Sequence, residues 1–553
     1  MSRDPRPDPR SDHRLDRRRF LGLAGAAGLA VGASQLAGCG RPPSPQDLGP
    51  PVSPPTYRPR SGLPTPDIAG TSDGVIPSSY FRYPGDPVRT VSGVPGDGRP
   101  VTILTETFSS IPPAVDRNSV WSNLNAQLGS PLQIQLVPQA DFGVKYATTV
   151  AGDALPDMFF ASPTPDFPRT PELMAAKALD LSDHLAGDAI LAYPNLANIP
   201  TDCWDVGRFD GRIYGLPSPR GAVSSGIVYR REDLLQAKGI TAEPQSFADF
   251  RALCAEVTDP RSSTWALTSP ALQYLRNMLD VPNFWRWDGS AMQSWWTDPR
   301  QEQALDAARG LVADGFVNPD AFTASASPKT WFGSGKAYFT ADAFTAWPSY
   351  YASYGETEGF AVDGLRIPAF DGGGEGSLWL SFPSFGFSAI SKAAADRVEA
   401  LLRIADYLAA PFGSAEYLAA KYGVEGPDFA LEDGTIAPTK SGTAGAQLGL
   451  KYLVDAPQVN FVPGNADAAR ACDRLLRELV PGATANDAVY LYSKTAADRF
   501  AQSQTRFTAL ENDIMQGRKP VSTWRTEADA WWKRYGRQMS EELGQAYAEA
   551  GRG

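Results

Sequence analysis

Strand-like and helix-like patterns alternate between residues 101 and 161. The run 101–107 is a predicted strand, and the apolar spacing over 120–128 predicts a helix. Apolar residues alternate with glutamines over 132–136, as in a second strand. A helical stretch near 146–150 then precedes the run 152–161, whose apolar end suits a buried parallel strand. Strands that alternate with helices predict βαβ units, so we expect the chain to fold as an α/β protein.

Three later helices have recognisable ends. Ser246 followed by Asp249 resembles a capping box, and the range 298–315 begins with Asp-Pro and ends in Gly, as a helix would. A third helix is predicted between 391 and 411, where apolar residues at helical spacing form a stripe that would face a core. These helices extend the α/β pattern over the rest of the chain.

The first 38 residues have the pattern of a cleaved export signal. Three consecutive arginines at 17–19 precede a short apolar stretch of small residues. The arginines resemble a twin-arginine signal, although Asp16 stands where Ser or Thr is usual and Gly22 where Lys is common. The sequence Leu-Ala-Gly-Cys at 36–39 is similar to the lipobox of bacterial lipoproteins. This similarity implies that Cys39 carries lipid and that the protein works outside the cytoplasm, anchored to a membrane.

The alternative for residues 20–38 is a transmembrane helix, because the stretch is about long enough to span a bilayer. Alanine and glycine dominate the stretch, and a cysteine ends it where a lipobox requires one, which favours a signal peptide over 1–38. The range 39–98 is predicted to be a tether. Ten prolines between Pro42 and Pro66 favour extended polyproline II structure there.

The charge of the chain excludes one class of partner. The net charge is −11, and loss of a signal that holds seven arginines and four aspartates leaves 515 residues with a net charge of −14. Nucleic-acid binding needs a basic face, so we expect no nucleic-acid partner. The remaining length is sufficient for two or three ordinary domains.

Few residues are available for metal or nucleophilic chemistry. Only His13 and His184 are present, and His13 lies in the signal, which nearly excludes histidine-based zinc sites and Ser-His-Asp or Cys-His catalysis. No aspartate-rich loop of the EF-hand type occurs, so neither a metal nor a cofactor is expected. Once the lipobox cysteine is set aside, at most one disulfide can form among the remaining cysteines, which are Cys203, Cys254 and Cys472.

A series of segments in fixed order resembles one family. Arg-Ile-Tyr-Gly-Leu-Pro at 212–217 is followed by Gly-Ile-Val-Tyr at 226–229, then by Gly239 and a capped helix at 244–250. This order resembles the family 1 extracellular solute-binding proteins, which capture ligands, mostly sugars, for ABC importers. The segments that resemble the same family elsewhere in the chain are 152–160, 331–340 and 385–391. Residues 422–434 and 514–535 look like the branch that includes the alginate-binding proteins, and the resemblance covers roughly 100–547.

The resemblance implies a two-lobed α/β architecture, the periplasmic-binding-protein type II fold, with a ligand cleft between the lobes. It implies crossings between lobes near 222–228 and 383–388. The implied first lobe is 99–222 with 335–382, and the implied second lobe is 223–334 with 383–547. A ligand that contacts both lobes favours closure, and a population shift from 1:99 to 99:1 requires about 5.5 kcal/mol of differential binding.

Aromatic side chains for stacking and a few polar side chains suit a sugar ligand. Thr107 and Phe108 end the first predicted strand and Ser162 follows the third, where ligands of open α/β sheets bind. Arg220 lies next to the first crossing and Trp379 precedes the second. Arg220 is either a clamp for a hydroxyl or carboxylate or part of a surface ion pair.

Resemblance to the maltodextrin-binding proteins implies a stacking ring just after the strand near 340. Phe344 or Trp347 can take this role here. Trp285 either adds a second stacking platform or packs an edge ribbon.

The resemblance implies a lipid-anchored, monomeric protein that binds a carbohydrate and delivers it to ABC permease subunits without catalysis. The first alternative is a secreted polysaccharide-processing enzyme, which needs two carboxylates about 5 to 10 Å apart. The second is a binding protein that serves a sensor or an adhesion role.

Overall fold

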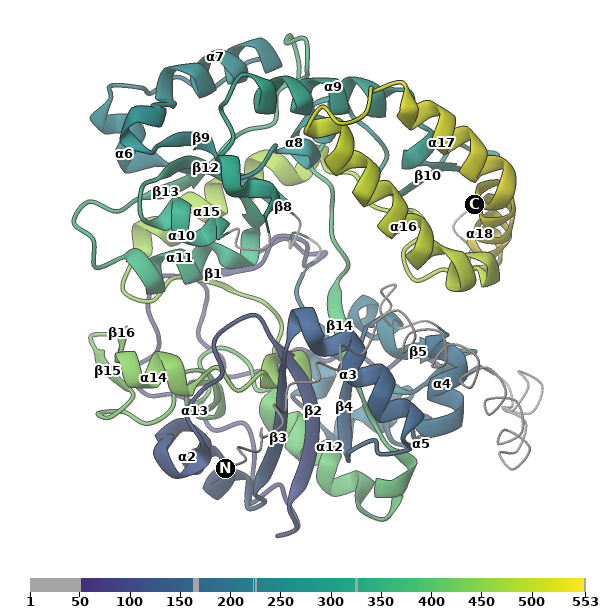
Figure 1. The fold of residues 1–553 in the computed structure, drawn as a ribbon. Coiled ribbons are helices and arrows are strands. Elements are labelled where there is room, and N and C mark those ends of the chain that lie inside the picture. The colour runs from purple at the N-terminus through teal and green to yellow at the C-terminus, as the bar shows by residue number, and fades with distance from the viewer. Residues whose placement is uncertain (1–50, 163–168, 222, 224–225, 324–326, 552–553) are drawn as a thin grey trace, which may run out of the picture. The chain divides into compact units, whose positions relative to one another are not determined.

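The computed structural model describes residues 51–162, 169–221, 223, 226–323 and 327–551. The export signal over 1–38 and the lipidation site Cys39 lie outside these residues. The described residues from 51 onward form one compact unit that contains two separate main sheets, each with its own helices and core. We call the part built on the five-stranded sheet the first lobe and the part built on the four-stranded sheet the second lobe (Figure 1).

The five-stranded sheet has the order β3-β2-β4-β14-β7. Its strands are β2 (Val101–Thr107), β3 (Leu132–Pro138), β4 (Met158–Ala161), β7 (Gly215–Pro219) and β14 (Ser384–Ile390). β2 is parallel to β3 and β4, and β14 runs antiparallel between β4 and β7. The predicted βαβαβ pattern is confirmed, with α2 (Ser119–Leu128) and α3 (Gln139–Ala151) as the connecting helices.

Both faces of this sheet are buried. Met158 and Phe159, which are neighbours in β4, belong to two different apolar clusters, as do Ala389 and Ile390 in β14. A sheet covered on both sides requires near-continuous apolar strands, which explains why 158–161 has no polar residue. The helices of the first lobe are α2, α3, α4 (Thr170–Lys177), α5 (Ser182–Leu185), α12 (Val398–Leu408), α13 (Ala415–Lys421) and α14 (Lys440–Gly445).

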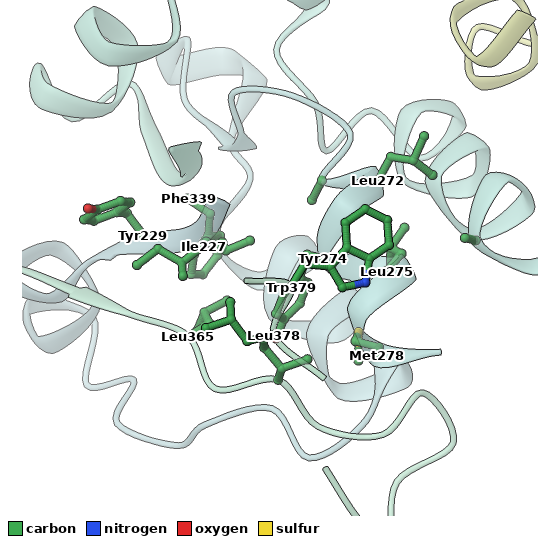
Figure 2. Close-up of a cluster of buried hydrophobic side chains, with 14 of the residues drawn as sticks. Ile227, Tyr229, Leu272, Tyr274, Leu275, Met278, Phe339, Leu365, Leu378 and Trp379 are labelled. Atoms are coloured by element: carbon green, nitrogen blue, oxygen red, sulfur yellow. The ribbon is translucent and has the colours of Figure 1, made fainter. Parts of the chain in front are cut away.

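The four-stranded sheet has the order β13-β8-β12-β9. β12 and β13 run antiparallel to β8, and β9 is parallel to β12. Figure 2 shows part of the core beside this sheet, where Tyr229, Phe339 and Leu275 are buried together. The strands are β8 (Gly226–Arg231), β9 (Trp265–Leu267), β12 (Ala337–Ala343) and β13 (Val362–Gly364). The helices that belong to this lobe are α6 (Glu232–Ala237), α7 (Phe247–Val257), α8 (Leu272–Met278), α9 (Arg300–Ala313), α10 (Pro328–Gly333), α11 (Trp347–Tyr354) and α15 (Ala466–Leu479).

The predicted helix ends agree with this structure. The Ser246 hydroxyl accepts the Asp249 N–H at the start of α7, and α9 follows Pro299. Gly315 adopts φ of +76° just after α9, a backbone conformation that glycine reaches without strain. The stripe predicted within 391–411 is buried on α12 through Leu401, Leu402 and other residues of the first lobe.

The strand pairing contradicts the predicted division of the chain. Residues 335–382 were assigned to the first lobe, yet β12 pairs with β8 from Phe339↔Arg230 to Ala343↔Gly226. Residues 383–547 were assigned to the second lobe, yet β14 pairs with β4 and β7 in the first. After β14, the chain joins the second core again from Val462 onward, just before α15. The apolar pattern of a strand does not identify its partner, because long-range packing decides the pairing.

Three C-terminal helices complete the second lobe. These are α16 (Lys494–Met515), α17 (Thr523–Trp531) and α18 (Arg537–Glu549), which gather near β10 (Trp285–Trp287) in Figure 1. The Trp296 ring lies 4.4 Å from the Phe507 ring and 4.7 Å from the Trp531 ring, centroid to centroid. Tryptophan therefore serves here chiefly to bury apolar surface between helices.

The segment 51–98, predicted to be part of a tether over 39–98, packs against both lobes instead. β1 (Ser79–Tyr80) pairs in parallel with β17 (Asn460–Phe461), and Ile76 belongs to the second core. Val52 packs against the first core. The prediction is wrong for 51–98, because apolar side chains and backbone hydrogen bonds attach the segment despite its prolines. Residues 39–50 lie outside the described residues.

The other strands form small two-stranded ribbons or short pairs. They are β5 (Arg208–Phe209), β6 (Arg212–Ile213), β11 (Met292–Ser294), which pairs with β10, and β15 (Phe429–Glu432) with β16 (Thr435–Pro438). Short 3₁₀ helices include Phe344–Ala346 and Leu450–Tyr452, and both adjoin the site described below. Among the described residues, no helix is both long enough and apolar enough to cross a membrane.

The three cysteines left after Cys39 are free and buried, and no disulfide joins them in the described part of the chain. Burial raises the pKa of the thiols of Cys203, Cys254 and Cys472 above the usual range. Cys254 lies on the buried face of α7 and acts as a small apolar residue there.

Candidate functional site

Aromatic and basic side chains meet where several strands of the first sheet end. Phe108 follows β2, Arg220 follows β7, and Phe385 lies near the start of the antiparallel β14. Lys451 and Tyr452 belong to the 3₁₀ helix Leu450–Tyr452. Parallel strands bring their carboxyl ends to one edge of a sheet, and an antiparallel neighbour brings its amino end to that edge. The fold therefore gathers residues that are distant in sequence.

The Arg220 guanidinium lies over an aromatic ring. Its central carbon is 4.2 Å from the centroid of the Phe385 ring and 5.7 Å from that of the Tyr452 ring. The backbone N–H groups of Arg220 and Gly221 both donate to the Pro383 carbonyl, at 2.9 and 3.1 Å. This double contact holds the loop after β7 against the start of β14, so the position of the guanidinium is set by the fold.

Phe385 is the centre of an aromatic group. Its ring is stacked with Phe160 at 5.8 Å between centroids, and it lies 5.3 Å from Tyr452 and 6.0 Å from Phe108. Phe108 is 59% exposed, so one large ring of the group is open to solvent. We call Phe108, Phe385 and Tyr452 the aromatic platform.

Two lysines stand beside the platform. The Lys451 ammonium lies 5.1 Å from the centroid of the Tyr452 ring. The Lys421 ammonium forms an ion pair with Asp455 at 2.6 Å. Two adjoining cavities of about 210 and 160 Å³ both include Lys421 and Lys451 in their walls. Arg220 and Asp455 line the larger cavity, and Thr107 and Tyr452 line the smaller.

The environment changes two pKa values. The pKa of Lys451 is lowered to about 8, first because protein surrounds the ammonium and reduces its solvation, and then because Arg220 and Lys421 are positive neighbours. The side chain keeps access to solvent all the same. Burial raises the pKa of the Tyr452 phenol to about 12, and the nearby Arg220 offsets part of the rise.

Four of the eight predicted site residues lie at this place. Besides Phe108 and Arg220, Thr107 lines the smaller cavity, where its hydroxyl accepts the Ser109 N–H at 3.0 Å. The Ser162 hydroxyl is buried and donates to the Phe385 carbonyl at 3.4 Å. Thr107 and Ser162 therefore support the loops that carry the platform.

The other four predicted residues are buried in the second core. They are Trp285, Phe344, Trp347 and Trp379. Trp347 has 0% exposure and lies 5.3 Å from the Tyr229 ring. The Trp379 indole donates to the Val281 carbonyl at 2.9 Å, and Figure 2 shows it beside Leu275 and Met278. Buried rings offer no free face for a sugar, so this structure gives no support to stacking at these four positions.

Sequence reasoning missed Lys421, Lys451, Tyr452 and Asp455. Lys421 ends α13, Lys451 and Tyr452 belong to a short 3₁₀ helix, and Asp455 follows that helix. No motif or periodicity distinguishes these residues. Phe385 lies within the predicted crossing near 383–388, but its position beneath Arg220 depends on the pairing of β14 with β7. Within the described ranges, no cluster of three or more His, Cys, Asp or Glu residues could hold a metal ion.

Solved structures share this fold at low sequence identity. Alginate-binding protein AlgQ2, in a structure without calcium ion, aligns with a TM-score of 0.60 and 15% identity over 83% of this chain and 100% of its own. The N-glycan transport solute-binding protein NgtS of Streptococcus pneumoniae, in complex with Man1GlcNAc, gives 0.60 and 13% over 82% of this chain and 99% of its own. The S. pneumoniae ABC-transporter substrate-binding protein FusA, in complex with kestose, gives 0.55 and 17% over 82% and 97%.

These alignments confirm the predicted fold class. The chain has the two-lobed α/β fold of the ABC-transporter solute-binding proteins that its sequence resembles. Neither a protein-family model nor a curated protein sequence matches the chain.

Proposed function

We propose that this chain is an extracytoplasmic solute-binding protein that captures a carbohydrate, specifically an oligosaccharide, and delivers it to an ABC importer. The observation that carries the proposal is the aromatic platform beside Arg220 and Lys451, in a fold shared with proteins solved in complex with Man1GlcNAc and kestose. Ring faces that stack on sugar C–H groups and donors that bind hydroxyls are the two features a carbohydrate site needs.

The larger cavity supports a closing mechanism. Its wall contains Arg220, which follows β7 of the first lobe, and Thr345, which follows β12 of the second. A ligand in this cavity contacts both lobes, and such contacts stabilise the closed form over the open one.

The N-terminal sequence supports the proposed location. The signal over 1–38 would direct export, and acyl chains on Cys39 would anchor the protein to the membrane beside its permease. We propose that the protein acts as a monomer in this role.

The enzyme alternative lacks a candidate pair of carboxylates at this site. Among the described residues that line either cavity, Asp455 is the only acid, and it is ion-paired with Lys421. A glycosidase requires a general acid and a second carboxylate on the two sides of the scissile bond. The proposal is therefore binding without catalysis.

Titration of the purified protein with a panel of neutral and acidic oligosaccharides tests this function. Intrinsic tryptophan fluorescence and the melting temperature report binding, and chromatography shows whether the glycan is returned unchanged. We expect saturable binding near 1 μM, about −8.2 kcal/mol, with no cleavage. Cleavage would favour the enzyme, and no response across the panel would exclude a carbohydrate ligand of the kinds tested.

Two variants separate the platform from other exposed rings. Phe108→Ala removes the exposed ring of the platform. We expect it to weaken oligosaccharide binding up to about tenfold, within the roughly 0.5–1.5 kcal/mol that a ring contact contributes. Tyr492→Ala removes a ring that is also half-exposed but lines neither cavity, and it should leave the affinity unchanged.

The anchor needs its own experiment. In cells fed a labelled fatty acid, the full-length chain should acquire the label and fractionate with membranes. Cys39→Ala should lose the label. Equal labelling of both proteins would reject lipidation at Cys39.

A further inference from the structure

Positive charge is concentrated at the candidate site of an otherwise acidic chain. Arg220, Lys421 and Lys451 line the larger cavity, and Asp455 is the only acid among the described residues in its wall. The whole chain has a net charge of −11. A surplus of two positive charges at this one place therefore cannot follow from the average composition.

Two of the three cations have no carboxylate ion-pair partner among the described residues. No ion pair joins Arg220 or Lys451 to any described acidic side chain, whereas Lys421 is paired with Asp455. Most buried or half-buried arginines of this chain, such as Arg230 and Arg231, do have such partners. The Arg220 guanidinium instead lies over the Phe385 ring and is hydrogen-bonded to Tyr452, and no ion pair with a described acid occupies its other N–H donors.

Neighbouring charges of both signs act on the site. Lys329 of α10 acts on Lys451 in the same sense as Arg220 and Lys421, and only Asp455 opposes them there. Lys329 is itself paired with Asp342 at 3.4 Å, and the buried Glu106 acts on Tyr452. The lowered pKa of Lys451, about 8, is the consequence of protein burial and of this crowding of cations. An anion in the cavity would relieve the repulsion.

The cavity and the platform are adjacent. Lys451 lines both the larger cavity and the smaller one, which Tyr452 also lines, and the Phe108 ring centroid lies 5.7 Å from that of Tyr452. A ligand that carries both a flat apolar face and an anionic substituent matches this arrangement. The larger cavity of about 210 Å³ holds a group much larger than one water molecule.

We infer that the ligand is an anionic carbohydrate, with a carboxylate or sulfate group bound between Arg220 and Lys451 while a sugar ring stacks on the aromatic platform. The inference rests on the proposed carbohydrate binding and specifies its chemical class. Guanidinium forks bind carboxylate and sulfate oxygens in pairs, and an ammonium adds a point charge.

Calorimetric titration of the purified protein at pH 7 with three probes of equal length tests this inference. The three probe series are oligouronates, the methyl esters of these oligouronates, and oligosaccharides whose only charges are sulfate groups. We expect an anionic probe to bind at least tenfold more tightly than its uncharged counterpart. This difference should shrink as the salt concentration is raised from about 20 to about 500 mM, a range that runs from weak to strong screening. The better of the two anionic series identifies the group.

The outcomes separate the two proposals. If methyl-esterified or other neutral probes bind as well as the anionic ones, the inference is overturned and carbohydrate binding stands. If no probe binds, both are overturned.

Charge variants locate the anionic group. Arg220→Gln and Lys451→Gln should each weaken the anionic probe at least tenfold and change the affinity for a neutral probe less than threefold. Lys494→Gln makes the same charge change on α16, outside both cavities, and should have no effect. Equal losses for charged and neutral probes would indicate a packing role and overturn the inference.

Proton uptake gives an independent readout. An anion beside Lys451 should raise the pKa of that group, so binding at pH 8 should take up a fraction of a proton, measured by calorimetry in buffers of different ionisation enthalpy. Lys451→Gln should abolish the uptake even if its fold is slightly altered. Absence of uptake with an anionic probe bound would contradict the placement of the group at Lys451.

Discussion

The guanidinium carbon of Arg220 lies 4.2 Å from the centroid of the Phe385 ring. Arg220 follows β7 and Phe385 lies in β14, so the contact joins two antiparallel neighbours of the first sheet that are more than a hundred residues apart in sequence. A cation over a ring face gains about 0.5 to 2 kcal/mol, depending on how far it is desolvated. The contact also orients the cation toward the larger cavity that it lines.

We predict that Phe385→Leu reduces the magnitude of the free energy of ligand binding more than it lowers the free energy of unfolding. Leucine keeps apolar volume on the strand but removes the ring face beneath Arg220. The loss of about 0.5 to 2 kcal/mol corresponds to a roughly 2- to 30-fold rise in Kd. Calorimetric titration with the best probe measures the rise. A fall in melting temperature with no change in Kd would show that the ring serves packing alone.

We predict that Lys451 makes stability rise with pH above about 8. The pKa of Lys451 in the folded protein is lowered to about 8, so between that pH and the ordinary lysine pKa the unfolded chain binds more protons than the folded one. Stability therefore increases as pH rises through this window, and below it the burial penalty on the ammonium is fully present.

The comparison with Lys451→Gln isolates this effect from other titrating groups. Urea unfolding of both proteins at pH 7 and pH 10 measures their free energies of unfolding. The variant should be more stable than the wild type at pH 7, and this difference in stability should be smaller at pH 10. A difference between the two proteins that is independent of pH would contradict the lowered pKa.

The sequence predicted local structure well and long-range partners poorly. The strands and helices of 101–161 follow from apolar spacing, and the cap at Ser246 follows from side-chain chemistry, because both depend on neighbours within a few residues. The pairing of β12 with β8 depends on packing between residues a hundred positions apart, and the division into lobes was wrong for that reason.

About half of the candidate site could be predicted, again because local sequence locates some of its residues and long-range packing places the others. Phe108, Ser162 and Arg220 lie next to strand ends, which a pattern of strands can locate. The family resemblance predicts stacking at Trp347, and Trp379 precedes the second predicted crossing. Aromatic residues in a large core, however, have the same local pattern as those in a cleft. Lys451 lies in a short 3₁₀ helix whose position only the tertiary fold determines.

We predict that Asp406→Asn stabilises the protein at neutral pH. Burial raises the pKa of the Asp406 carboxyl to about 6, although the backbone N–H groups of Asn195 and Leu196 donate to it at 2.7 and 2.9 Å and partly oppose the rise. Between the ordinary aspartate pKa and about 6 the folded protein binds more protons than the unfolded chain, so stability falls as pH rises through this window. Asparagine keeps the acceptor oxygen without the charge.

Urea unfolding at pH 3.5 and pH 7 checks this expectation. The variant should match the wild type at the lower pH and exceed it at pH 7 by at most about 3 kcal/mol, which is the worth of roughly two pKa units. A variant that is less stable at pH 7 than the wild type would mean that the charged form is favoured by its hydrogen bonds.

We predict that the N-terminal segment 51–98 contributes to the stability of the folded body through Tyr83. Tyr83 is 1% exposed, its ring lies 4.9 Å from the Phe412 ring, and its hydroxyl donates to the Ser414 carbonyl at 2.6 Å. Tyr83→Phe should cost about 1 kcal/mol because one buried hydrogen bond is lost, and Tyr83→Ala should cost about 3 to 5 kcal/mol because a cavity forms as well.

Tyr57→Phe, at a position 47% exposed, should change stability by less than about 0.5 kcal/mol. Urea unfolding measures these changes in stability. Negligible losses at both positions would mean that the segment behaves as the free tether that its prolines suggested. A larger loss of stability at Tyr83 would establish the segment as part of the fold.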